Sequence, residues 1–447
     1  MSEVDYSKHI RRVDEAQPQQ NATNVADDAT DDVAVRPDMV QGGGLINSIL
    51  SLFGGDRVLW VIIIALMTIS VLVVYSSTAK MAYNPRSAIT TMQFLKTQFF
   101  TLGISIIALC VVHRVNSRVY RIWAKPLFWL AVMLTLMVYF TGQTTNGAAR
   151  WISIMGFQFQ PSEMLKVATV AFLARVLADR QSTIRTLQIV PSMKFWTWGS
   201  PKQQRIIKEG FIPILLPILI ACLVIFPAHT SSAVLVFGMS LVMLYIGRVR
   251  WVELFRILKW ALVGVAIVAL LGLGRSQTAG GRISTWIEVW TTDRTEVDVE
   301  DLSDTERSMI AIHKGGIMGR GAGQSAVRVE MTHPESDYAF AFFVEEYGLG
   351  LSIILIALYV WVFFRAIEIF ERCPKKFPAM LSLGVALLIT MQALLHLMVT
   401  VNIIPETGQT LPLISRGGSS MLFTAIGLGM ILSVSRQTAE GSHEEER

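Results

Sequence analysis

The stretch from Gly315 to Gly348 reads GGIMGRGAGQSAVRVEMTHPESDYAFAFFVEEYG, and it joins the two kinds of sequence that make up this chain. A glycine-rich, polar segment passes through one carboxylate, Asp337, and leads directly into an apolar segment. A lone Asp before a helix commonly caps its first turn, because the carboxylate accepts backbone N–H groups and complements the helix dipole. The other interpretation is a carboxylate that meets a water-soluble group at the edge of a membrane.

The composition of the chain indicates its class. The chain has 447 residues, of which 52% are hydrophobic and 16% are charged, and this balance is too apolar for a soluble protein of that length. The net charge of +5 is small and the basic residues are spread over many connectors, which is not the pattern of a nucleic-acid-binding surface. The three cysteines lack the spacing of a metal site or a disulfide framework. The sequence therefore predicts an integral membrane protein that binds no nucleic acid.

Apolar segments of about the length needed to cross a bilayer recur along the chain. They predict an all-α polytopic membrane protein with about ten transmembrane helices. The predicted crossings are residues 58–78, 94–113, 124–141, 161–179, 211–228, 231–247, 253–273, 348–370, 379–401 and 419–435. The transmembrane domain then covers residues 57–436, with a long connector at 274–337 between the seventh and eighth helices.

The two ends of the chain are polar. Residues 1–56 contain clustered Asp together with Gln, Asn and Ala, a composition that favours disorder and does not resemble a signal peptide. Within them, residues 45–53 have helical apolar spacing but are too short to span a bilayer, so we expect a helix lying in the interface. Residues 437–447 form a short carboxyl tail.

The distribution of Lys and Arg predicts the orientation in the membrane. Basic residues are plentiful in alternate connectors, which include residues 114–125, 180–208, 248–250 and 372–376, whereas the short connectors between them hold few. This asymmetry predicts that both termini are cytoplasmic and that Asp337 lies on the outer side. Since no ATP is available there, a reaction at that carboxylate requires a donor that arrives already activated.

Ionisable residues within apolar segments are costly, so they tend to be paired or functional. Glu163 and Lys166, in QPSEMLK, are one helical turn apart at the outer end of the fourth predicted crossing and can pair with each other. A structural ion pair and a substrate-binding role are both open for them. Glu345 and Glu346 are interpreted as acidic residues at the start of the eighth helix. His396 is interpreted as a hydrogen-bonded packing residue.

The predicted outer connectors contain groups suited to a phosphorylated lipid. Arg150 and Trp151, in NGAARWI, combine a cation with a ring that suits the headgroup region, although interfacial Trp residues are common. The glycines between Gly315 and Gly323 allow a close backbone approach to a ligand, but their spacing is not that of a nucleotide-binding loop. Residues 405–420, PETGQTLPLISRGGSS, are irregular backbone between two crossings, which predicts that they fold back into the bundle and wall a cavity.

These motifs together resemble a known family. GAARWI, FQPSEMLK, GGIMGRGAGQS, HPESD, EEYG and TGQTLPLISRGGSS follow one another as in the SEDS proteins, the peptidoglycan glycosyltransferases that include FtsW and RodA. The resemblance covers residues 57–436, and the polar extension and short tail are similar to those of the division branch, FtsW. It implies polymerisation of lipid II, a disaccharide-pentapeptide on undecaprenyl pyrophosphate, at the outer face of the bacterial cytoplasmic membrane. Such a reaction needs a carboxylate to accept the hydroxyl proton and positive charge at the departing pyrophosphate.

The resemblance also implies roles for residues of this sequence. Asp337 matches the family's catalytic aspartate and is expected to act as the general base. The expected substrate-binding residues are Arg150, Trp151, Glu163, Lys166, Arg282, Lys314, Arg328 and Ser419. A divalent cation, Mg²⁺ or Mn²⁺, is expected only as an ion bound to the pyrophosphate of the substrate. The sequence contains no set of residues dedicated to binding it. The implied partner is a single-pass class B penicillin-binding protein, similar to FtsI, together with other division proteins.

Several positions depart from the family pattern. FPAHTS stands where Gln-Pro-Asp-x-Gly-Thr is usual, so that Ala228 replaces an acid and His229 is new. Gln158 stands where an Arg often occurs and Arg416 where a Tyr is usual, which leaves the pyrophosphate contacts open. The alternatives are a RodA-type elongation polymerase, a flippase for lipid-linked precursors and a non-catalytic scaffold. Against the flippase, the sequence shows no convincing inverted repeat.

Overall fold

The computed structural model describes residues 54–82, 91–141, 143–145, 148–154, 157–192, 199–270, 276–291, 302–325 and 336–445. The predicted interfacial helix at 45–53 and the predicted contact residue Arg328 lie outside these ranges. The chain from Leu50 onward belongs to one compact unit.

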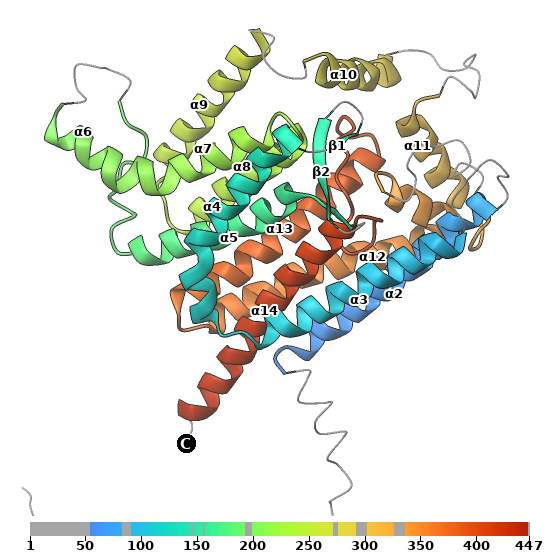
Figure 1. The fold of residues 1–447 in the computed structure, drawn as a ribbon, viewed down its shortest axis with the longest axis horizontal. Helices are drawn as coiled ribbons and strands as arrows, with labels where there is room; N and C mark the ends of the chain where they lie inside the picture. Colours follow the sequence, from blue (N-terminus) through green and yellow to red (C-terminus); the bar gives the residue numbers. More distant parts are fainter. Residues whose placement is uncertain are drawn as a thin grey trace, which may run out of the picture. The chain divides into compact units, whose positions relative to one another are not determined.

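The described chain is built mostly from helices (Figure 1). In chain order they are α2 (Arg57–Ala82), α3 (Thr91–Arg114), α4 (Ser117–Thr141), α5 (Pro161–Arg180), α6 (Pro201–Ile206), the π-helical segment η2 (Ile207–Leu215), α7 (Leu216–Ile225), α8 (Thr230–Ile246), α9 (Trp251–Leu270), α10 (Ser276–Thr291), α11 (Asp304–Gly315), α12 (Ala339–Arg372), α13 (Lys376–Thr400) and α14 (Gly418–Glu445). Two of them, α10 and α11, lie in the connector that was predicted as a long loop.

A small antiparallel sheet joins α4 to α5, and the all-α prediction did not include it. Its strands are β1 (Gln143–Thr145), β2 (Ala148–Ile154) and β3 (Phe157–Phe159), in the order β1-β2-β3. Trp151 pairs with Gln143 across the first ladder, and Ile152 pairs with Phe159 across the second. β-Branched and aromatic residues in this connector favour extended backbone. The strands are too short for the alternation of apolar and polar residues to be recognised in the sequence.

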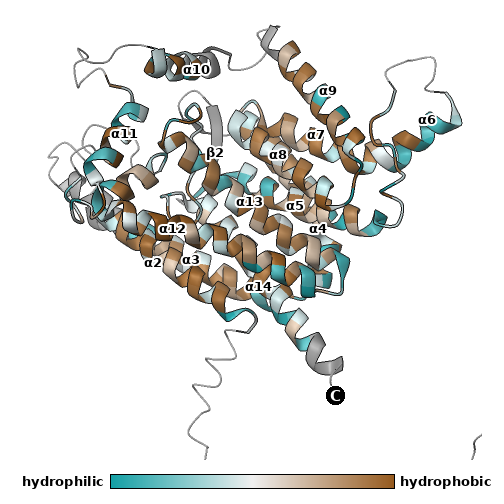
Figure 2. Cartoon of the chain, turned by 180° about the vertical axis from the view of Figure 1, so that it is seen from behind, coloured by the Kyte–Doolittle hydropathy of each residue, from teal (hydrophilic) through white to brown (hydrophobic). Residues whose placement is uncertain are grey.

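Seven of the described helices contain segments long and apolar enough to cross a bilayer. These segments are Arg57–Ser76, Lys96–Arg114, Ser117–Phe140, Pro201–Ile225, Ala339–Arg372, Lys376–Thr400 and Gly418–Glu440. The apolar helix α8 is shorter, and α5 and α9 occupy two further predicted crossings. Figure 2 shows that the bundle helices are predominantly hydrophobic, whereas α6 and parts of α11 are hydrophilic. The polytopic membrane class is confirmed, and the count of about ten crossings stays a prediction.

The eighth predicted crossing, 348–370, corresponds to the second part of a kinked helix. α12 starts at Ala339, and Gly348, the predicted start, lies inside it with φ 81 and ψ 170. These angles make a kink that a residue with a side chain rarely adopts. Glu345 and Glu346 therefore lie at the end of the first part of α12, directly before the part that the crossing at 348–370 predicted.

The fifth predicted crossing, 211–228, combines parts of two helical segments, and a third segment precedes them. α6, η2 and α7 follow one another without a break, and η2 contains Pro213. A proline inside a helix removes one backbone donor and clashes with the preceding turn, so the wider π-helical winding is expected around it. Gly210 allows this segment to pass close to the backbone of Gln188, since a Cβ there would lie less than 3.0 Å from the Gln188 carbonyl oxygen.

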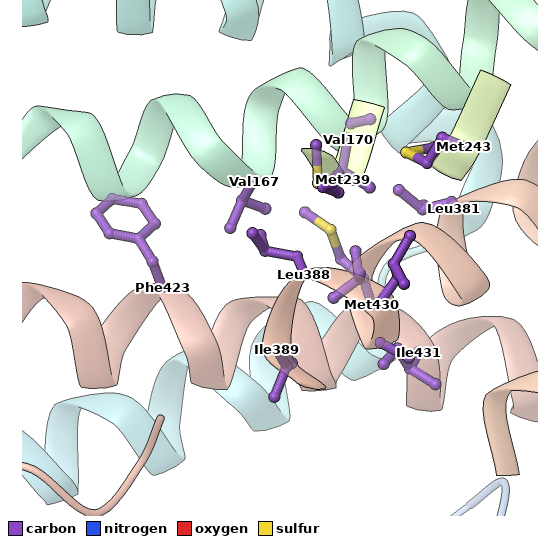
Figure 3. Close-up of a cluster of buried hydrophobic side chains, with 14 of the residues drawn as sticks. Val167, Val170, Met239, Met243, Leu381, Leu388, Ile389, Phe423, Met430 and Ile431 are labelled. Atoms are coloured by element: carbon purple, nitrogen blue, oxygen red, sulfur yellow. The ribbon is translucent and has the colours of Figure 1, made fainter. Parts of the chain in front are cut away.

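The hydrophobic core lies where α5, α8, α13 and α14 meet. Val167 and Val170 of α5 lie in one cluster with Met239 and Met243 of α8, and side chains of α13 and α14, such as Leu388 and Met430, pack against this group (Figure 3). α13 contacts α5, α8, α12 and α14, so it is the central helix of the described bundle. Gly384 of α13 provides room for Met243, because a Cβ at that position would lie 2.7 Å from the methionine methyl.

Candidate active site

Asp337 lies in the turn that leads into α12, and its side chain is partly exposed. The hydroxyl of Ser336 donates a hydrogen bond of 3.0 Å to Asp337 Oδ1. The N-cap residue of the helix is Tyr338, which makes no side-chain capping bond, so Asp337 stands one residue before the capping position. This placement favours a carboxylate presented at the end of the bundle over a carboxylate used as a helix cap.

Tyr338 anchors this turn against α11. Its side chain is buried, and its hydroxyl lies 3.1 Å from Thr305 Oγ1. Burial, together with the negative charges of Glu406 and Asp337, raises the pKa of Tyr338 well above its usual value. The hydroxyl therefore stays neutral, and an uncharged buried side chain holds the backbone beside the carboxylate.

The segment 405–417 folds back into the bundle, as predicted, and forms the other side of this region. Tyr359 of α12 donates a hydrogen bond of 2.5 Å from its hydroxyl to the carbonyl of Pro412. Ser415 donates a bond of 2.7 Å from its hydroxyl to the carbonyl of Ser336. The segment is therefore bonded both to the body of α12 and to the turn that carries the carboxylate.

His396 of α13 joins the same segment to the start of α12. Its Nδ1 lies 2.7 Å from the carbonyl oxygen of Gln409, and its Nε2 accepts a bond of 3.4 Å from the backbone N–H of Phe340. Since a carbonyl only accepts and an N–H only donates, the ring carries its proton on Nδ1. The side chain is buried, which confirms the interpretation of His396 as a hydrogen-bonded packing residue.

Glu163 and Lys166 form the predicted ion pair, and the pair is buried. Lys166 Nζ lies 2.8 Å from Glu163 Oε1, and the two side chains are only 1% and 9% exposed. Lys166 also donates a bond of 2.9 Å to Oε1 of Gln392, whose Nε2 donates a bond of 3.0 Å to the carbonyl of Thr410. The ammonium is thus connected through one amide side chain to the segment 405–417.

A small pocket lies beside this ion pair. Glu163, Lys166 and Gln392 provide its polar wall, and the rest of its lining is largely apolar, including Val167 and Phe423. Among the described residues, Asp337 is not part of the lining. The segment 405–417 connects the turn that carries the carboxylate to the ion pair, through Ser415 at one end and Thr410 at the other.

The glycine-rich segment packs against the backbone of α12. A Cβ on Gly315 would lie less than 3.0 Å from the carbonyl oxygen of Val344, and a Cβ on Gly319 would lie equally close to that of Glu346. Real Cβ atoms do not approach backbone so closely. The expectation that these glycines bring backbone near a ligand is wrong for Gly315 and Gly319, which bring it near a helix instead.

Two buried carboxylates of α12 hold the end of this glycine-rich segment. Glu346 accepts a bond of 3.0 Å from the backbone N–H of Gly323 and another from the hydroxyl of Ser76 in α2. Glu345 accepts a bond from the hydroxyl of Ser325. Both side chains are buried, with Glu345 0% and Glu346 1% exposed. Their role is to accept hydrogen bonds from donors of a neighbouring loop.

The other predicted contact residues lie on three different helices. Arg282 of α10 donates a bond of 3.4 Å to the carbonyl of Glu406. Lys314 is exposed on α11. Ser419 is fully buried in the first turn of α14, and its hydroxyl has no hydrogen-bond partner among the described residues.

Arg150 and Trp151 both belong to β2. The ring of Trp151 is partly buried, whereas the side chain of Arg150 lies outside the part of the chain that the structure describes. The structure therefore positions the strand but does not relate the Arg150 guanidinium to Asp337. The roles of both residues in substrate binding stay predictions.

The departures from the family pattern fall in different environments. Gln158 is exposed in β3, Arg416 is partly buried in the segment 405–417, and Ala228 is buried. His229 is 7% exposed and bonded to the side chain of Gln409. A polar residue inside an apolar run is the signal that could have revealed Gln392 as well, since it lies one helical turn before His396 on α13.

No group of three or more His, Cys, Asp or Glu side chains that could hold a metal ion occurs among the described residues. The described residues around Asp337 therefore provide no preformed site for Mg²⁺ or Mn²⁺. A cation that arrives with a substrate stays a prediction, and none of the steps proposed below passes through a metal ion.

Residues 56–440 match the sequence model of the FtsW/RodA/SpoVE family, described as cell cycle proteins. Stage V sporulation protein E of Bacillus subtilis (strain 168) is 28% identical over 386 residues, which are 85% of this chain and 97% of that protein. A probable peptidoglycan glycosyltransferase FtsW of Geobacter sp. (strain M18) is 26% identical over 386 residues, covering 86% of this chain and 97% of that protein.

Two solved structures share the fold. The rod shape determining protein RodA of Thermus thermophilus superimposes with a TM-score of 0.57 at 22% identity, covering 86% of this chain and 97% of that one. A chain from a peptidoglycan synthase complex, solved to explain the coordination of polymerization and crosslinking, gives a TM-score of 0.61 at 21% identity over 86% of this chain and 98% of that one. Because the family match extends over nearly all of the described helices, this chain belongs to the FtsW/RodA/SpoVE family.

Proposed function

We propose that this chain is a peptidoglycan glycosyltransferase that polymerises lipid II at the outer face of the bacterial cytoplasmic membrane, with Asp337 as the general base. Family membership and the FtsW relatives support the activity. The structural observation that carries the proposal is the partly exposed carboxylate of Asp337, held between the start of α12 and the segment 405–417. A carboxylate in this position can meet a headgroup at the end of a membrane bundle.

The proposed reaction joins two lipid-linked sugars. The 4-hydroxyl oxygen of one sugar attacks the anomeric carbon of the other, and the bond from that carbon to the diphosphate oxygen breaks. The diphosphate leaves with the bonding electrons, and the hydroxyl proton passes to a carboxylate oxygen of Asp337. Because a sugar hydroxyl is a very weak acid, the carboxylate takes the proton as the new bond forms and not beforehand.

Positive charge is needed where the diphosphate departs. Arg282, which contacts the segment 405–417, and the exposed Lys314 are the described cations proposed for this role. Lys166 is buried and already paired with Glu163, so we assign it no contact with the departing diphosphate.

The test compares polymerisation of fluorescent lipid II by the purified full-length protein and by its Asp337→Asn variant. Asparagine keeps the size and the hydrogen bond from Ser336 but removes the proton acceptor, so we expect a loss of about 10²-fold or more in strand formation. Muramidase digestion of the product confirms its identity as glycan. Strands formed by the variant at the parent rate would exclude a general base at Asp337.

The same preparation distinguishes the alternative functions. In vesicles, lipid II translocation without strand formation by the parent protein indicates a flippase. Absence of both activities, even with a class B penicillin-binding protein added, indicates a scaffold.

We further propose that the working assembly contains a single-pass class B penicillin-binding protein and acts at the division septum. The support is the peptidoglycan synthase complex with the same fold and the naming of several relatives as FtsW. A fluorescent fusion concentrated at midcell supports the division role. Distribution along the side wall indicates the RodA-type role instead.

A further inference from the structure

A tight turn with two large apolar side chains at its tip follows α11. Ile317 and Met318 are 73% and 88% exposed, although the segment around them, residues 315–325, consists mostly of glycine and polar residues. A single exposed apolar side chain is ordinary on a protein surface. Two neighbours at the tip of one turn form a patch, and such a patch indicates contact with an apolar partner.

Backbone hydrogen bonds hold this turn, so its conformation does not depend on burying the two side chains. The N–H of Gly319 donates a bond of 2.8 Å to the carbonyl of Gly315, the last residue of α11, and closes the turn. The N–H of Leu349 in α12 donates a bond of 2.9 Å to the carbonyl of Gly316. The turn is therefore fixed to α11 and to the kink of α12, while its apolar tip stays exposed.

The turn meets α12 at the expected depth of one edge of the bilayer. Arg365, which pairs with Asp56 and Glu368, marks the charged end of the apolar part of α12. Crossing the hydrocarbon core takes about 20 helical residues, and counting that number back from Arg365 leads to Glu345. The carbonyl of Glu345 accepts a bond of 2.9 Å from the N–H of Arg320. The turn is thus bonded to α12 where the opposite edge of the hydrocarbon core is expected.

The apolar tip adjoins an exposed apolar side of α12. Leu349, Leu351 and Ile354 are exposed just after the kink, within a segment long and apolar enough to cross a bilayer. Leu349 is also the residue whose N–H bonds to the turn. The lipid that covers this side of α12 in a membrane therefore reaches the tip of the turn.

Arg320 provides a charge that suits the headgroup region. Its side chain is 42% exposed, and its Nη1 lies 3.7 Å from Oε1 of the buried Glu345. A guanidinium has several N–H donors, so it can bind a phosphate while it stays near this carboxylate. Apolar side chains beside a cation are typical of segments that enter the acyl-chain boundary and contact headgroups.

We propose that residues 316–320 form a membrane-inserting turn. Ile317 and Met318 enter the edge of the hydrocarbon core in the outer leaflet, and Arg320 contacts a phospholipid phosphate. The partner of this surface is the lipid bilayer. Since the turn is bonded to α11 and α12, its insertion fixes the depth of the two helices that meet beside Asp337. The inference does not depend on the proposed glycosyl transfer.

The unmodified protein offers the first test, because Met318 reports its own environment. The purified full-length protein in phospholipid nanodiscs is treated with chloramine-T, a water-soluble oxidant, and conversion of each methionine to its sulfoxide is measured by peptide mass spectrometry. Met133 is the control, since it is exposed on α4 within an apolar span. We expect Met318 to react within about threefold of Met133 and at least about tenfold more slowly than in the denatured chain. Oxidation of Met318 at the rate of the denatured chain would overturn the insertion.

Spin labels provide a second, independent measurement of depth. Met318→Cys, Ile354→Cys and His313→Cys are each labelled in a background in which serine replaces the native cysteines Cys110, Cys222 and Cys373. Ile354 is a lipid reference on α12, and His313 is an exposed polar position on α11. Accessibility to oxygen, which concentrates in the bilayer, is divided by accessibility to a water-soluble nickel chelate. We expect the ratio at 318 to be within about threefold of that at 354, and a ratio equal to that at 313 contradicts the proposal.

The role of Arg320 can be separated from its ion pair with Glu345. Arg320→Gln removes the charge, so we expect oxidation of Met318 to become about fivefold faster in phospholipid nanodiscs. In micelles of an uncharged maltoside detergent there is no phosphate, and the substitution should leave the rate unchanged. An equal increase in both media assigns the effect to the pair with Glu345 and overturns the phosphate contact.

The same measurements distinguish the membrane from a protein partner. The nanodiscs of the first test contain this chain alone, so protection of Met318 there comes from lipid. If Met318 reacts as in water in those discs and becomes protected only when a class B penicillin-binding protein is added, the turn is a docking surface for that protein. This result would overturn the lipid proposal and leave the proposed polymerase in place.

Discussion

Lys166 Nζ and Glu163 Oε1 lie 2.8 Å apart, one turn from each other on α5, and neither side chain has more than slight contact with solvent. The spacing alone allowed a structural pair or a substrate contact. The structure shows both features, since the pair is buried in the bundle and also forms the polar wall of a pocket. Its contribution to stability and its contribution to activity can therefore be measured separately.

Removing one member of this pair should cost more than replacing both. Lys166→Met leaves the Glu163 carboxylate buried without its cation, a situation that costs about 3–5 kcal/mol. The double variant Glu163→Leu, Lys166→Met leaves no unpaired charge, so we expect its thermal unfolding midpoint to lie above that of Lys166→Met. If the double variant were less stable than Lys166→Met, the unpaired charge of Glu163 would not be the main cause of the loss of stability in the single variant.

Gly319 and Gly323 offer a matched test of the packing between the glycine-rich segment and α12. Their φ angles are 77° and 79°, but a Cβ on Gly319 would collide with the backbone of Glu346, whereas a Cβ on Gly323 would meet nothing within 4 Å. Alanine at either position introduces similar backbone strain of about 1 kcal/mol. We expect Gly319→Ala to lower the thermal unfolding midpoint clearly more than Gly323→Ala, and equal effects would contradict the observed contact.

Glu346 should control how firmly the glycine-rich segment is held. Glu346→Ala leaves the backbone N–H of Gly323 and the hydroxyl of Ser76 without this carboxylate, which costs about 1–3 kcal/mol for buried donors. We expect faster amide hydrogen exchange across residues 316–325, measured by mass spectrometry. Glu371→Ala removes an exposed carboxylate from the same helix and serves as the control, with no change expected in that segment.

His396 should stabilise the segment 405–417 through its two hydrogen bonds. His396→Leu removes the bonds to Gln409 and Phe340, whereas His396→Asn can keep a donor near the Nδ1 position and so keep the bond to Gln409. At about 1 kcal/mol per bond, we expect the parent to be the most stable, the Asn variant intermediate and the Leu variant the least stable. If the polymerisation rates follow the same order, the two hydrogen bonds of His396 also support the activity of Asp337. A Leu variant as stable as the parent would contradict a stabilising role for these hydrogen bonds.

The large features of the fold could be predicted because they depend on local sequence. The apolar stretches that became α2, α3, α13 and most of α12 are each long enough to cross a bilayer, and this length is visible without knowledge of neighbours. Helix ends were less accurate, since α12 begins at Ala339 and α14 continues to Glu445. At these ends, loop packing and not hydropathy decides where the helix starts or stops.

The site could be predicted only in part. The motif that contains Asp337 pointed to the turn before α12, and the spacing of Glu163 and Lys166 correctly indicated a pair. The contacts of Glu346 with Ser76 and of His229 with Gln409 could not be predicted, because their partners lie 270 and 180 residues away in the chain. Sequence patterns report the period of an element and say nothing of which distant side chain will face it.

The sequence by itself determined that this is a multi-helix membrane protein of the FtsW/RodA/SpoVE family with a carboxylate before one long helix. Only the tertiary structure decided that the glycine-rich segment packs on α12, that Glu345 and Glu346 hold it, and that Ser415 bonds the segment 405–417 to the turn before Asp337. The physical reason is that burial in a bilayer depends on the run of side chains along one segment. Hydrogen bonds and close backbone contacts depend instead on which segments the folded chain brings together.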